Sequence, residues 1–139
     1  KGINYRLARC CNPIYGDPVF GFISSEGVIK IHRDDCPNAA HIRQKYGYRI
    51  IRTRWSGQAG TQLPASLRVV GKDDIGIVTN ITSIINKEKS VSLRSISIDS
   101  HDGLFHGVLV VGVNDISSLN QLIKKIEAVK GVKNVQRNK

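Results

Sequence analysis

"SLRSISIDSHDGLFHGVLVVGV", residues 92–113, decides the fold of the second half of this chain. Its first arm, residues 92–99, alternates polar and apolar side chains, a pattern typical of a half-buried strand. The tripeptide HDG at 101–103 predicts a turn, and residues 105–113 are apolar enough to form a second strand. We therefore expect a long β-hairpin at this point of the chain.

The segments on either side of this hairpin each add one strand and one helix. Before it, residues 65–71 read as a strand, and the apolar side chains between Ile77 and Ile85 share one helical face. After it, Asp115 can cap a helix that Gly131 ends, and residues 132–136 form a last strand. The order strand–helix–strand–strand–helix–strand predicts a ferredoxin-like βαββαβ domain of the α+β class.

The first 55 residues follow a different pattern, a small β-rich module with one helix. Pro37 in a first turn and Gly47 beyond the end indicate a helix within 35–47. Short strands are expected at 3–10, 19–25, 28–32 and 49–55. The polar, glycine-rich segment 56–64 is the natural linker. The expected domains are therefore residues 1–55 and 65–139, joined by residues 56–64.

The chain is strongly basic, with 21 lysines and arginines against 11 acidic residues and a net charge of +10. Residues 1–60 carry 10 basic and 4 acidic side chains, a net +6. Such a surplus favours a polyanionic partner such as nucleic acid, although it also serves solubility. No apolar run approaches the roughly 20 residues that cross a bilayer, so no membrane partner is expected. Because Lys1 is not an initiator methionine, we interpret the sequence as a fragment of a longer protein.

Three cysteines are too few for a secreted disulfide framework, which favours a reduced, cytoplasmic setting. Cys10, Cys11, His32 and Cys36 together make a Cys₃His set, which suits structural zinc. The adjacent pair Cys10–Cys11 does not have the usual finger spacing, so one or both could instead be small buried side chains. A disulfide between neighbours would be strained. A nucleophilic role for Cys36 lacks an orienting third residue.

Motifs of catalysis are missing from the sequence. The segment HRDD at 32–35 is similar to a kinase catalytic loop, but the required asparagine is replaced by Ala39. His101-Asp102 falls in an expected turn without further metal ligands, and no Walker loop is present. We expect this fragment not to be an enzyme.

The segment "CCNPIYGDPVFGFISSEGVIKIHRDDCPNA", residues 10–39, resembles the cysteine-containing regulatory module of long RelA/SpoT-type alarmone synthetase/hydrolases. The second half, including "GKDDIGIVTNIT" at 71–82, resembles the ACT domain that ends those proteins. In this family Cys10, Cys11, His32 and Cys36 match the positions that give the module its zinc-finger name. The resemblance implies either a zinc site or a metal-free ribosome-binding module in which the same residues pack the fold.

The resemblance also implies a regulatory function in the bacterial stringent response. Parent proteins make (p)ppGpp from ATP and GTP or GDP, and many hydrolyse it, with N-terminal domains that this chain lacks. Their C-terminal modules sense amino-acid starvation on a ribosome carrying deacylated tRNA. The implied partners are ribosomal RNA, tRNA and the parent's own catalytic domains. Trp55 or Tyr48 could stack on a base, and the candidate phosphate contacts are Arg33, Arg43, Lys45, Arg49, Arg52 and Arg54.

ACT domains bind amino acids at dimer interfaces through a strand-to-helix turn. Here that turn comprises Asp73, Asp74, Ile75, Gly76 and Ile77, and Gly76 would let backbone N–H groups approach a carboxylate. Asp74 replaces the usual arginine and would repel that carboxylate. The resemblance thus implies either binding of branched-chain amino acids or a homodimerising, autoinhibitory domain. The sequence does not say whether the parent synthesises (p)ppGpp, hydrolyses it or does both.

Overall fold

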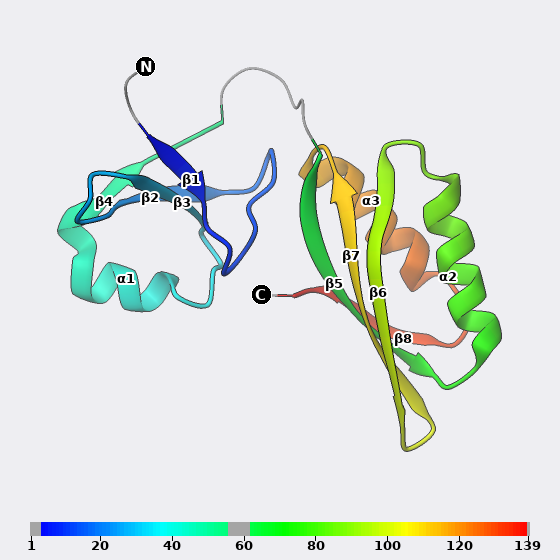
Figure 1. Cartoon of the computed structure of the whole chain (residues 1–139). Helices are drawn as coiled ribbons and strands as arrows, with labels where there is room; N and C mark the ends of the chain where they lie inside the picture. Colours follow the sequence, from blue (N-terminus) through cyan, green and yellow to red (C-terminus); the bar gives the residue numbers. More distant parts are fainter. Residues whose placement is uncertain (1–3, 56–61, 139) are drawn as a thin grey trace. The chain divides into compact units, whose positions relative to one another are not determined.

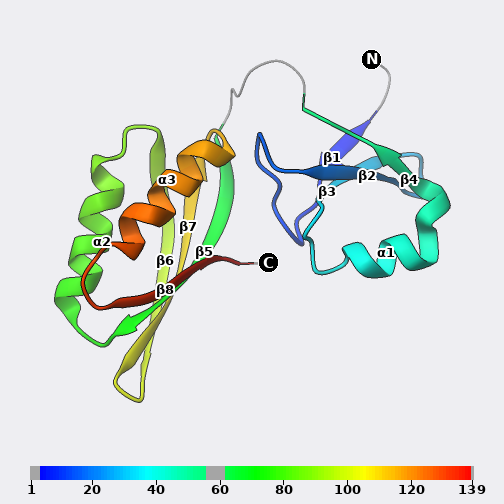
Figure 2. The same ribbon diagram turned by 180° about the vertical axis from the view of Figure 1, so that it is seen from behind.

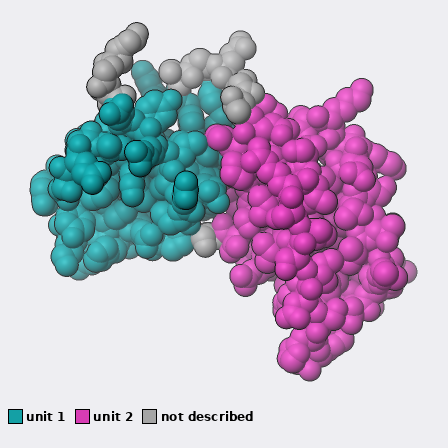
Figure 3. Space-filling view, in the orientation of Figure 1, with its two compact units in different colours: residues 1–59, 139 teal, residues 60–138 magenta. Residues whose placement is uncertain are grey.

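The computed structural model describes residues 4–55 and 62–138, which belong to two compact units (Figure 3). Among these residues, 4–55 form unit 1 and 62–138 form unit 2. Each unit has its own four-stranded sheet and its own buried core. No helix in the described part of the chain is long and apolar enough to cross a membrane.

Unit 1 is a mixed sheet with one helix (Figure 1). The strands β2 (Val19–Ile23) and β3 (Ile29–Arg33) form an antiparallel hairpin at its centre. Strand β1 (Tyr5–Leu7) pairs parallel to β3, and β4 (Ile50–Arg52) pairs antiparallel to β2, giving the order β1-β3-β2-β4. The helix α1 (Ala39–Tyr46) continues into the 3-10 helix η1 (Gly47–Arg49).

One face of this sheet packs against α1 and forms the core of unit 1. Phe20 of β2 meets Ala39 and Ile42 of α1 there, and the half-buried Phe22 and Ile50 border the cluster. Ala8, Cys11 and Cys36 complete the same cluster. The core of unit 1 therefore contains two of the cysteines, which places their chemistry inside the module.

Unit 2 has the expected βαββαβ order. Its elements are β5 (Leu63–Lys72), α2 (Ile75–Lys87), β6 (Val91–His101), β7 (Leu104–Val113), α3 (Ile116–Glu127) and β8 (Val132–Arg137). The sheet is antiparallel in the order β6-β7-β5-β8. Both helices lie on one face of it (Figure 2). The ferredoxin-like prediction is confirmed.

Apolar side chains from the sheet and both helices fill the core between them. Leu67 of β5, Leu109 of β7, Ile85 of α2 and Leu122 of α3 are all essentially inaccessible to solvent. Both helices begin at an aspartate: the side chain of Asp74 accepts from the Gly76 amide at 2.9 Å and that of Asp115 from the Ser118 amide at 2.8 Å. These caps satisfy amide groups that have no partner within the helix.

The hairpin turn is tighter than the sequence indicates. Strand β6 runs to His101 and β7 starts at Leu104, so only Asp102 and Gly103 form the loop. Both have positive φ values, 55° and 75°, as a two-residue loop matching the twist of its strands requires.

Several predicted boundaries in unit 1 were too long. The first strand covers Tyr5–Leu7 instead of 3–10, because the chain turns where the Asn12 amide donates to the Ala8 carbonyl at 3.0 Å. The last strand is Ile50–Arg52 instead of 49–55, because Arg49 belongs to η1. The helix starts at Ala39, after turns that include Pro37. Most of the expected linker, residues 56–61, lies outside the described residues, and its last two residues belong to β5.

Candidate functional site

Four metal-ligating side chains converge inside unit 1. Cys10 and Cys11 come from the turn after β1, His32 from β3, and Cys36 from the turn before α1. One ligand atom from each lies within 4.8 Å of the others, and three of the four residues are buried. The structure thus brings together all four residues that the sequence singled out.

Four of the six distances between donor atoms lie near the edges of a tetrahedral metal site. The Sγ atoms of Cys10 and Cys36 are 3.2 Å apart, and those of Cys10 and Cys11 are 4.0 Å apart. His32 Nδ1 lies 3.5 Å from Cys10 Sγ and 3.7 Å from Cys36 Sγ. A tetrahedron with Zn–S bonds of about 2.3 Å and Zn–N bonds of about 2.0 Å has edges of roughly 3.5–3.8 Å. The donor set and its spacing therefore suit zinc.

The backbone turn after β1 explains how two adjacent cysteines can serve one centre. In a strand, neighbouring side chains would point to opposite faces of the sheet. Here residues 9–11 lie in a turn closed by the bond from the Asn12 amide to the Ala8 carbonyl, and Asn12 adopts a positive φ of 48°. Asparagine is one of the few residues that take this conformation readily. This turn therefore allows the adjacent residues Cys10 and Cys11 to face one centre although they do not have the usual finger spacing.

Groups around the ligands hold them in place. The Arg33 amide donates to Cys11 Sγ at 3.3 Å, and the Asn38 amide hydrogen-bonds to Cys36 and favours its thiolate. The Phe20 ring stacks on the His32 imidazole, with centroids 5.3 Å apart and planes 12° from parallel. Such outer partners orient metal ligands and tune their basicity.

Burial controls the protonation of this cluster. Removal from water raises the pKa of Cys11 to about 12 and also raises the pKa of Cys36. Burial, with a smaller contribution from the charge of Lys30, lowers the pKa of His32. His32 is therefore a neutral imidazole at physiological pH, and a cation would have to displace the thiol protons.

The Arg33 side chain is buried beside the cysteine cluster and supports it. This position corrects the prediction that Arg33 contacts a phosphate. Its side chain is only 4% exposed and donates to both carboxylate oxygens of Asp35, at 2.8 and 2.7 Å. A third bond runs from Nη1 to the Cys11 carbonyl at 2.9 Å. The charge is neutralised and the donors face inward, so the guanidinium cannot reach an external phosphate.

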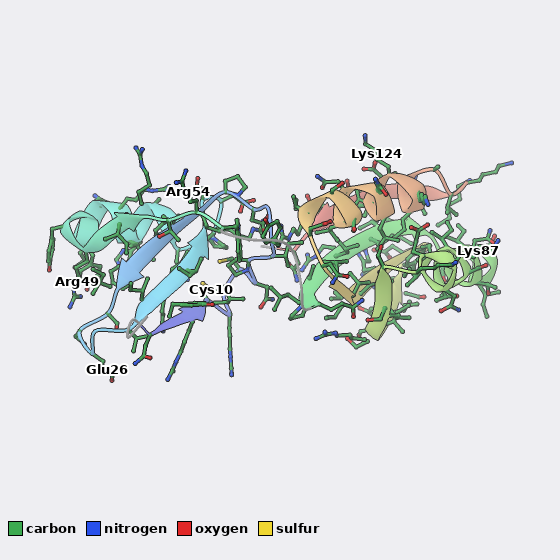
Figure 4. The ribbon with its side chains drawn as sticks, turned by 90° about the horizontal axis from the view of Figure 1, so that it is seen from above. Cys10, Glu26, Arg49, Arg54, Lys87 and Lys124 are labelled. Atoms are coloured by element: carbon green, nitrogen blue, oxygen red, sulfur yellow. The ribbon has the colours of Figure 1, made fainter. Side chains whose placement is uncertain are left out.

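The other predicted basic residues are at or near the surface of unit 1 but differ in their surroundings. Arg43 pairs with Asp34 at 3.4 Å and lies 4.8 Å from the centroid of the Phe20 ring. Arg49 lies 5.6–6.0 Å from the ring centroids of Phe22, Tyr46 and Tyr48. Lys45, Arg52 and Arg54 are exposed. Figure 4 shows Arg49 and Arg54 extending from different parts of the unit.

The two aromatic candidates have opposite environments. The Tyr48 side chain is 82% exposed. Trp55 is half-buried: its indole N–H donates to the Asp17 carbonyl at 2.9 Å, and its ring lies 5.7 Å from that of Tyr15. Asp17 is itself buried and its carboxylate accepts from the Ile14 amide at 2.8 Å. Sequence reasoning missed this support for Trp55, because it joins residues 38 positions apart.

The strand-to-helix turn of unit 2 already has a carboxylate at its helix start. Asp74 Oδ1 accepts from the Gly76 amide, the group that a ligand's carboxylate would approach. Asp73 accepts from the Ser100 hydroxyl at 2.9 Å, and Ile75 is 84% exposed. The Gly76 amide, which an amino-acid site on this turn would use, is therefore already bound by a carboxylate of the chain itself.

Two family models together cover almost the whole chain. The one described as the RelA/SpoT RIS domain matches residues 1–56, and the one described as the ACT domain matches residues 59–137. The chain belongs to the RelA/SpoT family. The metal-ligating cluster thus lies in the RIS domain of this RelA/SpoT-family chain, and unit 2 is its ACT domain.

Characterised relatives of this RelA/SpoT-family chain are much longer than it is. It is 29% identical over 136 residues to the bifunctional (p)ppGpp synthase/hydrolase RelA of Mycobacterium tuberculosis, covering 98% of this chain and 18% of the relative. It is 30% identical over 137 residues to the GTP pyrophosphokinase of Escherichia coli K12, covering 96% and 18%. The chain therefore spans less than a fifth of these relatives; the matched portion is C-terminal and is not catalytic.

A solved structure supports the fold of the ACT domain. The crystal structure of the ACT domain from the GTP pyrophosphokinase of Chlorobium tepidum is 33% identical, with a TM-score of 0.51. The match covers 56% of this chain and all of that domain.

Proposed function

We propose that this chain is a regulatory region that senses amino-acid starvation by contacting ribosomal RNA and deacylated tRNA in the cytoplasm. In the parent protein it would control the catalytic domains that make or hydrolyse (p)ppGpp. The observation that carries this proposal is the match to the RelA/SpoT RIS domain over a strongly basic unit.

The electrostatics of unit 1 support an RNA partner. Residues 4–55 hold nine basic and four acidic side chains. Asp34 and Asp35 are paired with arginines and Asp17 is buried, which leaves Glu26 as the exposed acidic side chain of residues 4–55 that forms no ion pair with a described residue. The surface therefore presents a surplus of positive charge, which attracts phosphates over a distance of about 10 Å at moderate salt.

Zinc, held by Cys10, Cys11, His32 and Cys36, is the metal that this donor set suits. Four protein ligands would close the coordination sphere and leave no position for a substrate, so the ion would stabilise the fold. It would tie the turn after β1 to β3 and to the turn before α1. By holding these segments together, the ion would keep the RNA-contacting side chains of unit 1 in position without touching them.

For unit 2 we propose self-association into a homodimer. Strand β6 is 11 residues long and, among the described strands, pairs only with β7, so its other edge is available for a second copy. Binding of branched-chain amino acids at residues 73–77 is less well supported, because a ligand's carboxylate would have to displace that of Asp74 from the helix start. Calorimetry with these amino acids tests that alternative.

Co-sedimentation with ribosomes tests the central proposal. The chain should pellet with ribosomes that carry deacylated tRNA in the A site, and binding should weaken steeply as salt rises. Ribosomes with an empty A site measure the contribution of the tRNA. Absence of co-sedimentation at low salt would refute the proposed function.

A further inference from the structure

The face of the unit 1 sheet that α1 leaves uncovered contains a groove of about 440 Å³. Its floor is apolar and includes Ile29 and Ile31 of β3 and Ile51 of β4. Tyr5 and Trp55 line it as well. This volume lies within the range of sites that hold small ligands, which is roughly 300–1,000 Å³.

A glycine on β2 shapes this face of the sheet. Gly21 pairs with Ile31 on one side and Ile51 on the other. A Cβ atom on Gly21 would lie only 2.7 Å from Thr53 Oγ1 and 2.9 Å from Ile51 Cγ1. The missing side chain therefore leaves room for Thr53 and Ile51, which line the groove, to pack over β2.

Two aromatic side chains of the groove offer flat surfaces. Tyr5 is 68% exposed, so most of its ring is open to a ligand. Trp55 is held in position by its bond to the Asp17 carbonyl and by Tyr15. A ring fixed before binding costs little entropy when a ligand stacks on it.

The charges at the groove have one sign. Arg52 and Arg54 are among the lining residues, on and just after the edge strand β4, and the described residues that line the groove include no acidic side chain. Because Arg52 pairs with Phe20, its side chain leaves β4 on the α1 side of this edge. Neither arginine forms an ion pair with a described residue, in contrast to Arg33 and Arg43. A ligand that is flat and apolar on one side and anionic on the other would satisfy both parts of the groove.

We propose that this groove binds an unpaired nucleotide of an RNA strand. The base would stack on Tyr5 or Trp55 over the apolar floor, while Arg52 and Arg54 would contact the adjoining phosphates. This assignment rests on the RNA-binding function proposed above and adds the form of RNA that is recognised. It predicts a preference for loops, bulges or single strands, because bases within an A-form duplex cannot reach such a surface.

An RNA strand fits the groove better than a free nucleotide. The groove is open, and both of its arginines are exposed, so it has no buried donors among the described residues to hold a lone phosphate. The surrounding basic surface would add contacts to neighbouring phosphates of the same strand, which a mononucleotide cannot use.

Trp55 provides a direct reporter, because it is the only tryptophan of the chain. We would titrate the chain at low salt with a hairpin RNA bearing an unpaired loop, with a duplex of equal length and charge, and with a mononucleotide. A base stacked in the groove quenches the Trp55 fluorescence. The loop RNA should quench it at micromolar concentration, while the duplex and the mononucleotide leave it nearly unchanged at the same concentration.

Substitutions at Tyr5 separate stacking from charge. Tyr5→Ala should weaken binding of the loop RNA at least fivefold, as loss of one aromatic stack predicts. Tyr5→Phe keeps the ring and should bind like the wild type. Because neither change removes a charge, the dependence of affinity on salt should stay the same in both variants. His101→Ala, at the exposed end of β6 in unit 2, controls for general effects of losing a surface ring.

The possible failures can be told apart. Tight RNA binding without quenching of Trp55, and without loss in Tyr5→Ala, would overturn the groove assignment and leave RNA binding by unit 1 intact. Equal quenching by the mononucleotide would assign the groove to a free nucleotide, and quenching by a peptide of the parent's catalytic half but not by RNA would assign it to a protein contact. Absence of any RNA binding would refute the proposed function itself.

Discussion

The Sγ atoms of Cys10 and Cys36 lie 3.2 Å apart although the two residues are 26 positions apart in the sequence. Between these cysteines the chain forms the whole β2–β3 hairpin and returns through His32 to the same point. The cluster therefore joins the two ends of the hairpin segment to one another. A metal ion bound by this cluster would close the loop between Cys10 and Cys36. It would stabilise unit 1 because the closed loop has less conformational entropy to lose when the chain folds.

We expect the purified chain to hold about one zinc ion. Removing the metal with a strong chelator should increase amide hydrogen exchange across residues 4–55, because the ligands come from three segments of unit 1. Residues 62–138 should exchange as before, since the ACT domain has its own core. Cys11→Ala should cause the same selective loss without a chelator. A metal-free chain with full protection in unit 1 would contradict this prediction.

Arg33→Lys should destabilise unit 1 by about 2 kcal/mol, because lysine keeps the charge but cannot form three hydrogen bonds in a fork. The expected loss of stability is no larger because Asp35 is 51% exposed and can be hydrated in the variant. Arg43→Ala provides the matched control: its pair with Asp34 is half-exposed on both sides and should contribute less than about 1 kcal/mol.

Urea unfolding of the two variants, monitored by Trp55 fluorescence, measures both effects. Equal stability of Arg33→Lys and the wild type would show that the buried guanidinium bonds contribute nothing to the fold. An RNA affinity that falls more for Arg33→Lys than for Arg43→Ala, at unchanged stability, would restore Arg33 as a phosphate contact.

Gly131→Ala should destabilise the ACT domain by about 3 kcal/mol, because backbone strain and overpacking add at this position. Gly131 has a φ of 99°, and a Cβ there would clash with Ile77 Cδ1. Gly103→Ala separates the two causes, because Gly103 has a φ of 75° but a Cβ there would have no neighbouring atom within 4 Å. Its cost should be about 1 kcal/mol. Thermal unfolding compares the two; equal losses would show that the contact with Ile77 relaxes freely.

The contrast between the two halves shows what the sequence could and could not predict. In the ACT domain, periodic apolar residues, the Asp115 cap and Gly131 indicated the element order, because local patterns there agree with the final packing. In unit 1 the strands are three to five residues long, too short for periodicity to fix their ends.

The candidate site was predictable in its chemistry but not in its geometry. Residue types identified the Cys₃His set, whereas the turn that aims Cys10 and Cys11 together depends on Asn12 at positive φ. The burial of Arg33 and the groove beside Tyr5 depend on contacts between distant segments. These features arise from tertiary packing and leave no local signal in the sequence.

Self-association should involve the free edge of β6. Ile98 on this strand is 41% exposed, and Ile98→Lys should shift the chain toward monomer, because a lysine on an edge strand disfavours pairing with another copy. Lys133→Ala on β8, the opposite edge of the sheet, should have little effect. Light scattering over a concentration series measures both. A wild-type chain that stays monomeric at high concentration would contradict the proposed homodimer.

The double variant Arg52→Ala, Arg54→Ala should weaken RNA binding and reduce its dependence on salt. Each phosphate contact contributes about 0.7–0.9 to the slope of log affinity against log salt, so the slope should fall by roughly 1.5 units. Lys124→Ala, Lys130→Ala removes the same charge from the exposed surface of unit 2 and controls for the long-range effect of net charge. It should weaken binding only slightly, since neither lysine belongs to unit 1. Equal slopes for both double variants would show that Arg52 and Arg54 act through net charge and make no direct phosphate contact.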